Sequence, residues 1–248
     1  MNEKELELKK ELETYKKYTK RAKELELELC LEDNYYFEKK LWKEGYKYIA
    51  GVDEVGRGPL IGPVVTAAVI LPPDFKLEGL TDSKKLTEKK REEYYKVIMK
   101  EALSVSIGIK DEKVIDEVNI YEATKLAMYE AISKLSIKPN YVLIDAMNLE
   151  KLDIPYKSII KGDLKSITIS AASVIAKVTR DHMLDQLDKK YPCYDLKHNK
   201  GYPTKKHIEA IEKYGIVEEH RKTFSPVCFH LNHKNTTKVD TKTKEKEQ

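Results

Sequence analysis

The amino-acid sequence predicts an α/β fold, with one mixed five-stranded sheet flanked by helices. Three strand-like apolar segments come first in the central part of the chain, and helical and strand-like segments then alternate. A run of strands followed by alternating helix and strand is typical of helices packed on a single sheet. The 248 residues are enough to bury a sizeable hydrophobic core.

The predicted strands are short apolar segments bounded by turn residues. The first ends in Asp53 and a glycine-rich turn, and two prolines stop the β-branched second strand. In chain order, the strands are Lys47–Asp53, Val64–Leu71, Leu103–Ile109, Tyr141–Asp145 and Lys157–Lys161. The predicted helices, recognised by apolar residues at helical spacing, are Glu88–Ala102, Tyr121–Leu135, Ser166–Lys189 and Lys205–Tyr214.

The two ends of the chain differ in composition from the centre. Half of residues 1–45 are charged, and their apolar residues recur at helical spacing, with a break at Asp33–Asn34. This predicts a helical hairpin, which is either an appendage that packs through one face or a dedicated binding module. We therefore expect an N-terminal helical extension, 1–45, a main domain, 46–229, and a disordered polar tail, 230–248.

Composition excludes several classes of protein. With 41% hydrophobic and 35% charged residues, the chain is too apolar to be disordered and too charged for a membrane protein. The first ten residues have no apolar segment for a signal peptide, so we expect a soluble cytoplasmic protein. The three cysteines form no C-x-x-C pair, which excludes a disulfide framework and a cysteine zinc site. The net charge of +4 permits a nucleic-acid partner without arguing for one.

Four acidic residues lie at or just beyond the ends of predicted strands. Asp53 and Glu54 end the first strand, Asp145 ends the fourth, and Asp163 follows the fifth. This rim is where open α/β sheets place their ligands. Carboxylates without a nearby His or Cys are the ligands that Mg²⁺ or Mn²⁺ prefers, and two such ions can promote phosphodiester cleavage. The four acids are therefore candidates for a divalent-metal site.

Each of these acids also has an ordinary structural interpretation. Asp163 precedes a helix as an N-cap does, and Asp145 is a common type of turn former. Asp53 and Glu54 are adjacent, so they point to opposite faces of a regular strand. They can share one metal only if the strand ends or bends there, and the glycines that follow permit such a bend.

Two glycine-containing loops could approach a ligand closely. In Gly56-Arg57-Gly58, exposed N–H groups could bind a phosphate or a sugar hydroxyl, although the segment is equally compatible with an ordinary tight turn. Tyr202 lies between a glycine and a proline, where its ring could be exposed to stack on a sugar or base. Burial of that ring in the core is the alternative.

The long predicted helix carries a polar stripe. Ser170, Ser173, Lys177 and Arg180 occupy an arc of about 80° at 100° per residue. Two hydroxyls and two cations on one face suit contact with a phosphate backbone, and Lys84 could also reach phosphate. A solvated polar face is the alternative for the helix, and plain surface charge for Lys84.

Six segments occur together in a recognisable order: YIAGVDEVGRGPLIGPVVTAAVIL (48–71), TDSKKLT (81–87), LIDAMNL (143–149), KGDLKSITISAASVIAKVTRD (161–181), KGYPTKKH (200–207) and HRKTFSPV (220–227). Together they resemble the ribonuclease HII branch of the type 2 ribonucleases H. The resemblance covers about residues 46–229. The sister branch, ribonuclease HIII, usually lacks the Gly-Arg-Gly loop and ends its acidic set in Glu, so Asp163 also favours the HII branch.

The resemblance implies a ribonuclease H-like fold and endonucleolytic cleavage of RNA paired to DNA. It also implies incision at single ribonucleotides embedded in duplex DNA, with 5′-phosphate and 3′-hydroxyl products. The expected partners are RNA–DNA hybrids and duplex DNA that contains ribonucleotides, with no membrane, and the expected oligomeric state is a monomer. Two alternatives are a non-catalytic nucleic-acid binding module and a DNA-directed nuclease of the same superfamily.

The resemblance also assigns roles to residues. Asp53, Glu54, Asp145 and Asp163 match the four acids that hold Mn²⁺ or Mg²⁺ in the family. The loop of Gly56, Arg57 and Gly58 would contact the ribose 2′-hydroxyl, and Tyr202 matches the tyrosine that senses the RNA–DNA junction. Phosphate contacts would then fall to Lys84, Ser170, Ser173, Lys177 and Arg180.

Overall fold

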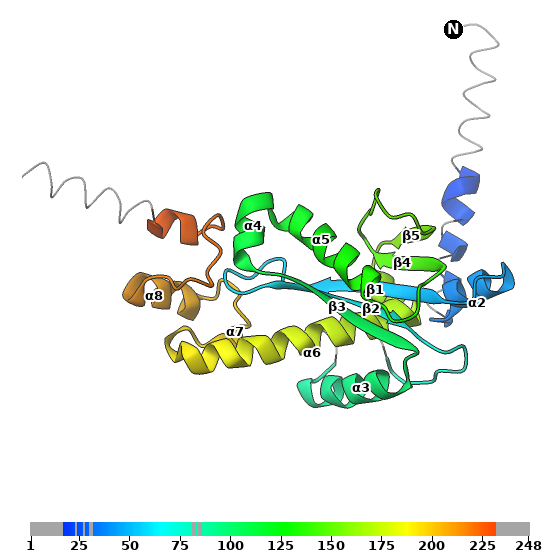
Figure 1. Ribbon diagram of the computed structural model, residues 1–248, viewed down its shortest axis with the longest axis horizontal. Coiled ribbons are helices and arrows are strands. Elements are labelled where there is room, and N and C mark those ends of the chain that lie inside the picture. The colour runs from blue at the N-terminus through cyan, green and yellow to red at the C-terminus, as the bar shows by residue number, and fades with distance from the viewer. Residues whose placement is uncertain are drawn as a thin grey trace, which may run out of the picture.

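The computed structural model describes residues 17–22, 24–26, 28–29, 32–80, 83 and 86–231. Its centre is a five-stranded sheet of β1 (Ile49–Val55), β2 (Val64–Ile70), β3 (Ser104–Lys110), β4 (Tyr141–Asp145) and β5 (Tyr156–Ile159). The strand order is β3-β2-β1-β4-β5 (Figure 1). The first three strands pair antiparallel, whereas β1, β4 and β5 run parallel. The mixed sheet predicted from the sequence is confirmed.

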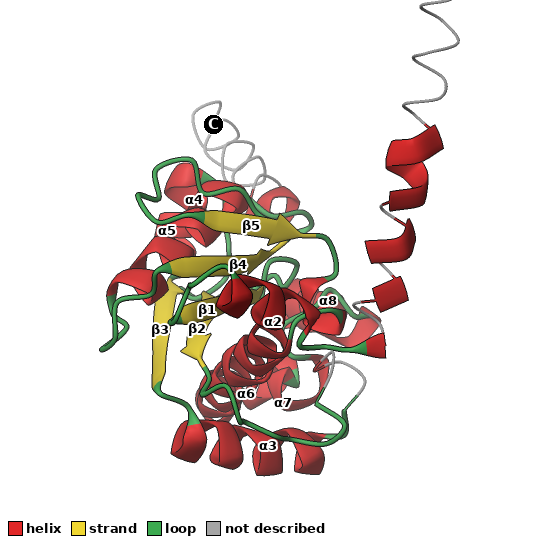
Figure 2. Cartoon of the chain, turned by 90° about the vertical axis from the view of Figure 1, so that its right-hand side faces the viewer, coloured by secondary structure: helices red, strands yellow, loops and turns green. Residues whose placement is uncertain are grey.

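The helices are α2 (Tyr36–Lys43), α3 (Glu88–Glu101), α4 (Glu112–Val118), α5 (Ile120–Ser133), α6 (Ile167–Lys190), α7 (Leu196–Asn199) and α8 (Lys205–Tyr214), with 3-10 turns η2 (Gly162–Leu164) and η3 (Pro192–Tyr194). Helix α5 packs on one face of the sheet and α6 on the other, with α3 on the outer side of α6 (Figures 1 and 2). Among the described residues, no helix has the length and apolar character needed to cross a membrane.

Most predicted elements lie within one or two residues of their observed bounds, and β4 and α8 match at both ends. Helix α4 was not predicted. It has seven residues, with Asp111 as its N-cap, and Asn119 separates it from α5 with a φ of 72°. Because this left-handed residue breaks the helical path, the periodicity of α5 does not continue back into α4.

Two glycines let the helices approach the sheet closely. A Cβ atom on Gly51 of β1 would lie 2.1 Å from the backbone carbon of Thr168 in α6. On the other face, a Cβ atom on Gly108 of β3 would lie 1.9 Å from the carbonyl oxygen of Ala127 in α5. Any larger residue would push a helix off the sheet, so Gly51 fixes how near α6 lies to the end of β1.

The predicted N-terminal extension contributes to the core of the main domain. Phe37 and Leu41 of α2 are buried together with Leu143 of β4 and Ile169 of α6. The break predicted at Asp33 precedes α2, as the sequence indicated. Residues 1–16 lie outside the described residues, as do residues 232–248 of the predicted tail. Residues 230 and 231, also assigned to the tail, are helical.

Glu38 of α2 caps the N-terminus of α6. Its fully buried Oε1 accepts hydrogen bonds from the hydroxyl of Ser166 at 2.6 Å and from the N–H and hydroxyl of Thr168 at 3.1 and 2.7 Å. The carbonyl of Asn34 accepts from the Ile167 N–H at 2.8 Å. First-turn N–H groups have no acceptor within their own helix, so the segment 34–38 supplies them for α6. Burial raises the pKa of Glu38 above its usual value.

We predict that Glu38→Ala lowers the free energy of unfolding by about 3 kcal/mol, because three donors around Oε1 lose their acceptor away from water. Lys40→Ala, at an exposed position of the same helix, is the matched control and should change stability by less than about 0.5 kcal/mol. Urea denaturation followed by circular dichroism measures both. Equal stability of the two variants would contradict the capping role of Glu38.

Candidate functional site

The sheet register places two of the four predicted acids side by side. In the parallel pair of β1 and β4, Val52 lies opposite Ile144. Asp53 and Asp145 are the next residues along these strands, and successive side chains alternate between the two faces. Gly51, two residues before Asp53, contacts α6, so both carboxylates lie on the face that α6 covers.

Glu54 lies within the regular part of β1. The strand continues to Val55 and stays paired with β2 along its length, so Glu54 points to the opposite face from Asp53. Its backbone N–H donates to Oδ1 of Asp53 at 2.7 Å, and its Oε1 lies 3.5 Å from Nη1 of Arg57. The bend that would bring the side chains of Asp53 and Glu54 onto one face therefore does not occur before Val55.

Asp163 lies on η2, directly before α6. The N–H of Gly162 donates to Oδ1 of Asp145 at 2.7 Å, which ties this turn to the end of β4. The hydroxyl of Ser170 donates to the carbonyl of Asp163 at 2.8 Å. The N-cap of α6 is Ser166, so the interpretation of Asp163 as an N-cap is wrong. The four acids therefore lie near one end of the sheet.

The carboxylate of Asp53 is buried among like charges. The residue is 5% exposed, and burial, followed by the charges of Glu54 and Asp145, raises its pKa well above its usual value. A hydrogen bond with Ser173 opposes that rise. The hydroxyl of Ser173 also lies 2.9 Å from that of Ser83, and both serines are buried. A buried anion beside other anions is costly unless a cation compensates it.

The chemistry of these residues fits a hard divalent cation. The donors are carboxylate oxygens, and a cation would compensate the buried charge and the neighbouring charges that raise the pKa of Asp53. Within the described part of the chain, no three His, Cys, Asp or Glu side chains are grouped closely enough to hold an ion by themselves. The site is therefore open, and water and phosphate oxygens commonly complete such a site around Mg²⁺.

Two buried guanidinium groups hold the Gly56–Gly58 loop. Arg221 donates to the carbonyls of Gly56, Arg57 and Gly62 at 2.6, 3.0 and 2.8 Å. Arg180 packs against Gly56, whose φ is 94°, and a Cβ atom there would lie 2.3 Å from Nε of Arg180. Position 56 therefore requires glycine, both for its backbone conformation and for the approach of Arg180.

Tyr202 lies beside this loop. Its side chain is 46% exposed, so burial of the ring in the core, the alternative interpretation, is wrong. A Cβ atom added to Gly58 would lie 3.2 Å from Cε1 of the ring. The N–H of Leu60 donates to the carbonyl of Gly201 at 2.8 Å and joins the two loops. The structure thus brings together the glycine loop and the exposed tyrosine that the sequence singled out.

The polar stripe of α6 does not form an exposed face, contrary to the sequence interpretation. Ser170, Ser173 and Arg180 are at most 5% exposed. The hydroxyls of the two serines contact Asp163 and Asp53, and Arg180 donates to three backbone carbonyls. Because α6 lies between the sheet and other elements, these side chains stabilise the site from inside and are not available to bind phosphate.

Lys177 and Lys84 are the other two residues that the sequence analysis assigned to phosphate contacts. Nζ of Lys177 lies 2.5 Å from Oδ1 of Asp181, and its side chain is 17% exposed, so it is largely engaged within the protein. Burial lowers the pKa of Lys177. Lys84 lies outside the described residues. Arg57, whose side chain is 41% exposed, is accessible beside Glu54.

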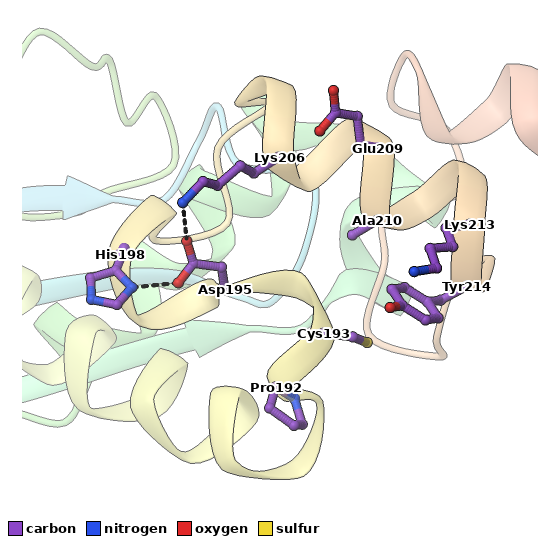
Figure 3. Close-up of a pocket in the computed structure, with 9 residues that line it drawn as sticks. All are labelled: Pro192, Cys193, Asp195, His198, Lys206, Glu209, Ala210, Lys213 and Tyr214. Atoms are coloured by element: carbon purple, nitrogen blue, oxygen red, sulfur yellow. Dashed lines mark hydrogen bonds and ion pairs between the residues drawn. The ribbon is translucent and has the colours of Figure 1, made fainter.

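A surface pocket of about 660 Å³ lies between η3, α7 and α8 and contains none of the four acids (Figure 3). Asp195 at its edge contacts His198 and forms an ion pair with Lys206 at 3.9 Å (Figure 3). The charge of Asp195 in this pocket is therefore compensated by His198 and Lys206. The carboxylates at the sheet end remain the candidate catalytic site.

Several contributors to the site were not assigned roles from the sequence. They are Glu38, Ser83 and Arg221. All except Glu38 lie within the six motifs, so the motifs contained a signal that spacing arguments did not use. Glu38 has no motif around it, and only the packing of α2 shows its contact with α6.

Comparison with known proteins gives a consistent result. Residues 50–230 match the family model described as Ribonuclease HII. The Ribonuclease HII of Bacillus cereus (strain Q1) is 59% identical over 191 residues, which are 77% of this chain and 74% of that protein. The structure is similar to the ribonuclease H2 of Pyrococcus horikoshii OT3, with a TM-score of 0.65 and 28% identity over 75% of this chain and 98% of that chain. The Bst-RNase HIII in complex with Mn²⁺, at 18% identity and a TM-score of 0.55, shares the fold over 75% of this chain and 69% of that one.

We predict that Gly56→Ala destabilises the protein by about 2 kcal/mol or more, because a side chain at positive φ alone costs roughly 1–3 kcal/mol and the new Cβ meets Arg180. Gly58→Ala is the matched control, since its Cβ would meet only the ring of Tyr202, and it should cost less than about 1 kcal/mol. Thermal denaturation of both variants measures the difference in stability between them. A Gly56→Ala variant as stable as Gly58→Ala would show that the loop is not anchored as described.

We predict that Asp53→Asn raises the Tm of the protein in chelator, because it removes a buried charge beside two others. It should also abolish stabilisation by added Mg²⁺ or Mn²⁺, which binds the folded state in the wild type. Asp74→Asn, at an exposed position, is the control for loss of one negative charge. If Mn²⁺ raised the Tm of Asp53→Asn as much as that of the wild type, Asp53 would not be a metal ligand.

Proposed function

Because this chain belongs to the ribonuclease HII family, we propose that it incises duplex DNA at single embedded ribonucleotides, in addition to cleaving the RNA strand of RNA–DNA hybrids. Hybrid cleavage is the activity of the family. The incision activity is supported by the position of the Gly56–Gly58 loop next to the exposed ring of Tyr202. The expected products carry a 5′-phosphate and a 3′-hydroxyl.

Asp53 and Asp145 are the ligands that we assign first to a Mg²⁺ or Mn²⁺ ion, with Glu54 and Asp163 as further acids of the site. Their support is the adjacency of Asp53 and Asp145 on neighbouring strands, and the burial and neighbouring negative charges that raise the pKa of Asp53. When bound, divalent ions activate a water for attack at phosphorus and offset charge on the leaving oxygen. Ser173 keeps the Asp53 carboxylate oriented through its hydrogen bond.

Recognition of the ribonucleotide requires a contact to its 2′-hydroxyl, because that group alone distinguishes it from DNA. Arg221 holds the carbonyls of Gly56 and Arg57, so the polar groups that this loop can offer to a sugar are its N–H donors. The absence of a side chain at the exposed Gly58 lets a sugar approach this backbone. We assign the 2′-hydroxyl contact to this loop, with the Arg57 side chain available for a nearby phosphate.

Tyr202 is assigned to the sugar on the 3′ side of the ribonucleotide. Its ring is half-exposed and lies within van der Waals reach of position 58, so one substrate strand could contact both the loop and the ring. A deoxyribose fits against the ring, whereas a second 2′-hydroxyl would crowd it. This arrangement would favour the junction at which RNA gives way to DNA.

The test uses one labelled duplex with a single ribonucleotide and its all-DNA twin, each with Mg²⁺, Mn²⁺ or chelator. Incision at the ribonucleotide alone, dependent on the metal, is expected. Asp53→Asn and Asp145→Asn should lose turnover to the detection limit and still bind the duplex, because binding comes mainly from phosphate charge. Equal cleavage of the all-DNA twin would favour a DNA-directed nuclease. Binding without cleavage by the wild type would favour a non-catalytic module.

We predict that Tyr202→Ala lowers incision at the single ribonucleotide by about tenfold or more, since a stacked ring contributes roughly 1–3 kcal/mol. Duplex affinity should fall less, because phosphate charge supplies most of it. Tyr202→Phe, which keeps the ring, is the matched control and should retain most of the activity. Full activity of Tyr202→Ala on this substrate would mean that the ring does not recognise the junction.

A further inference from the structure

Two histidines form a buried pair next to the loop that carries Tyr202. His207 of α8 and His220 are both fully buried, and their Nε2 atoms lie 3.3 Å apart. The ring of Tyr194 packs edge-on against both, with centroid distances of 5.9 and 5.0 Å. Among the described residues no carboxylate is hydrogen-bonded to either ring, although the charge of Glu219 acts on His220, so backbone groups set the proton positions of the pair.

The backbone groups around the pair determine the tautomer of each ring. The N–H of Val217 donates to Nδ1 of His220 at 3.1 Å, so the proton of His220 is on Nε2. The carbonyl of Tyr202 can only accept, and it lies 3.0 Å from Nδ1 of His207, so the proton of His207 is on Nδ1. Nε2–H of His220 then donates to Nε2 of His207. The two assignments agree, and they form one chain from Val217 to Tyr202.

Both rings are neutral in this arrangement. Burial is the main cause that lowers the pKa of each, and the pKa of His220 falls to about 4. A second proton on either ring would place an N–H against another donor. The chain of hydrogen bonds is therefore fixed in one direction, towards the carbonyl of Tyr202.

The carbonyl of Tyr202 is the third of three consecutive carbonyls that the protein holds. Each accepts a hydrogen bond from a different part of the chain, which fixes the path of the loop. Lys200 O accepts from Arg180 at 3.0 Å, Gly201 O from the Leu60 N–H at 2.8 Å, and Tyr202 O from His207 at 3.0 Å and from the Thr204 N–H at 2.8 Å. Since the ring itself is half-exposed, these contacts fix the backbone from which it extends.

We propose that His207, with its tautomer set by His220, is a positioning residue that holds the ring of Tyr202 for recognition of the RNA–DNA junction. The inference rests on the role of Tyr202 in the proposed function. The new element is that incision at the junction depends on a hydrogen-bond donor at the Nδ1 position of residue 207. Loss of this donor should lower kcat more than it raises KM, since phosphate charge governs binding of the duplex.

Two substitutions test the two nitrogen atoms of the His207 ring separately. The amide nitrogen of Asn stands near the position of Nδ1, whereas the amide oxygen of Gln can stand near the position of Nε2 and accept from His220. His207→Asn therefore keeps a donor for the Tyr202 carbonyl, whereas His207→Gln keeps only the contact with His220. We expect kcat on the single-ribonucleotide duplex to stay within about threefold of wild type for His207→Asn and to fall about tenfold for His207→Gln.

Three comparisons make the outcome decisive. Thermal denaturation shows whether both variants are folded, and ¹⁵N NMR of the wild type reads the tautomers directly, with a proton on Nδ1 of His207 and on Nε2 of His220 expected. His207→Gln combined with Tyr202→Ala should incise no more slowly than Tyr202→Ala alone, because both changes act through one ring.

Opposite tautomers, or equal kcat for folded His207→Asn and His207→Gln, would overturn the positioning role. If Tyr202→Ala lowers incision but His207→Gln does not, the positioning inference fails and the role of Tyr202 stands. If Tyr202→Ala itself leaves incision unchanged, the proposed function of Tyr202 fails and the inference fails with it.

Discussion

The buried carboxylate of Asp53, next to Asp145 and Glu54, is the constraint on which the site depends. Such a charge is unfavourable in the folded protein and persists because the surrounding structure holds it there. The parallel pairing of β1 with β4 sets Asp53 beside Asp145, and Gly51 lets α6 approach closely enough for Ser173 to reach Asp53. A divalent cation at this sheet end would remove that unfavourable interaction, which is the physical basis of the proposed metal site.

A second set of contacts places the recognition elements around these acids. Arg180 and Arg221 are fully buried cations whose hydrogen bonds go to backbone carbonyls of loops that are distant in sequence. Guanidinium groups suit this role, because their donors are arranged in a rigid fork and their charge is hard to remove. The loops are thus held by the interior of the protein, while Arg57, Gly58 and the ring of Tyr202 remain exposed at the surface.

Local patterns predicted the sheet well, because β-branched runs ended by turn residues have few alternatives. Tyr141–Asp145 was predicted to the residue, which placed Asp145 at the strand end, whereas β1 continues two residues beyond Asp53 to Val55. The interior of α6 was not predictable in this way. Spacing cannot distinguish a polar side chain that faces water from one that donates to a distant carbonyl, and the Arg180 contacts with Ile61 and Pro63 span more than a hundred residues. The capping contact of Glu38 crosses a similar separation.

The central claim is that the end of β1 and β4 on the α6 side binds a divalent cation. Anomalous diffraction at the manganese edge, from crystals of the full chain grown with Mn²⁺, tests it most directly. The account predicts a manganese peak against the carboxylates of Asp53 and Asp145, and loss of that peak in crystals of Asp53→Asn. Manganese bound only elsewhere, for example at the Asp195 pocket, with none at Asp53, would contradict it.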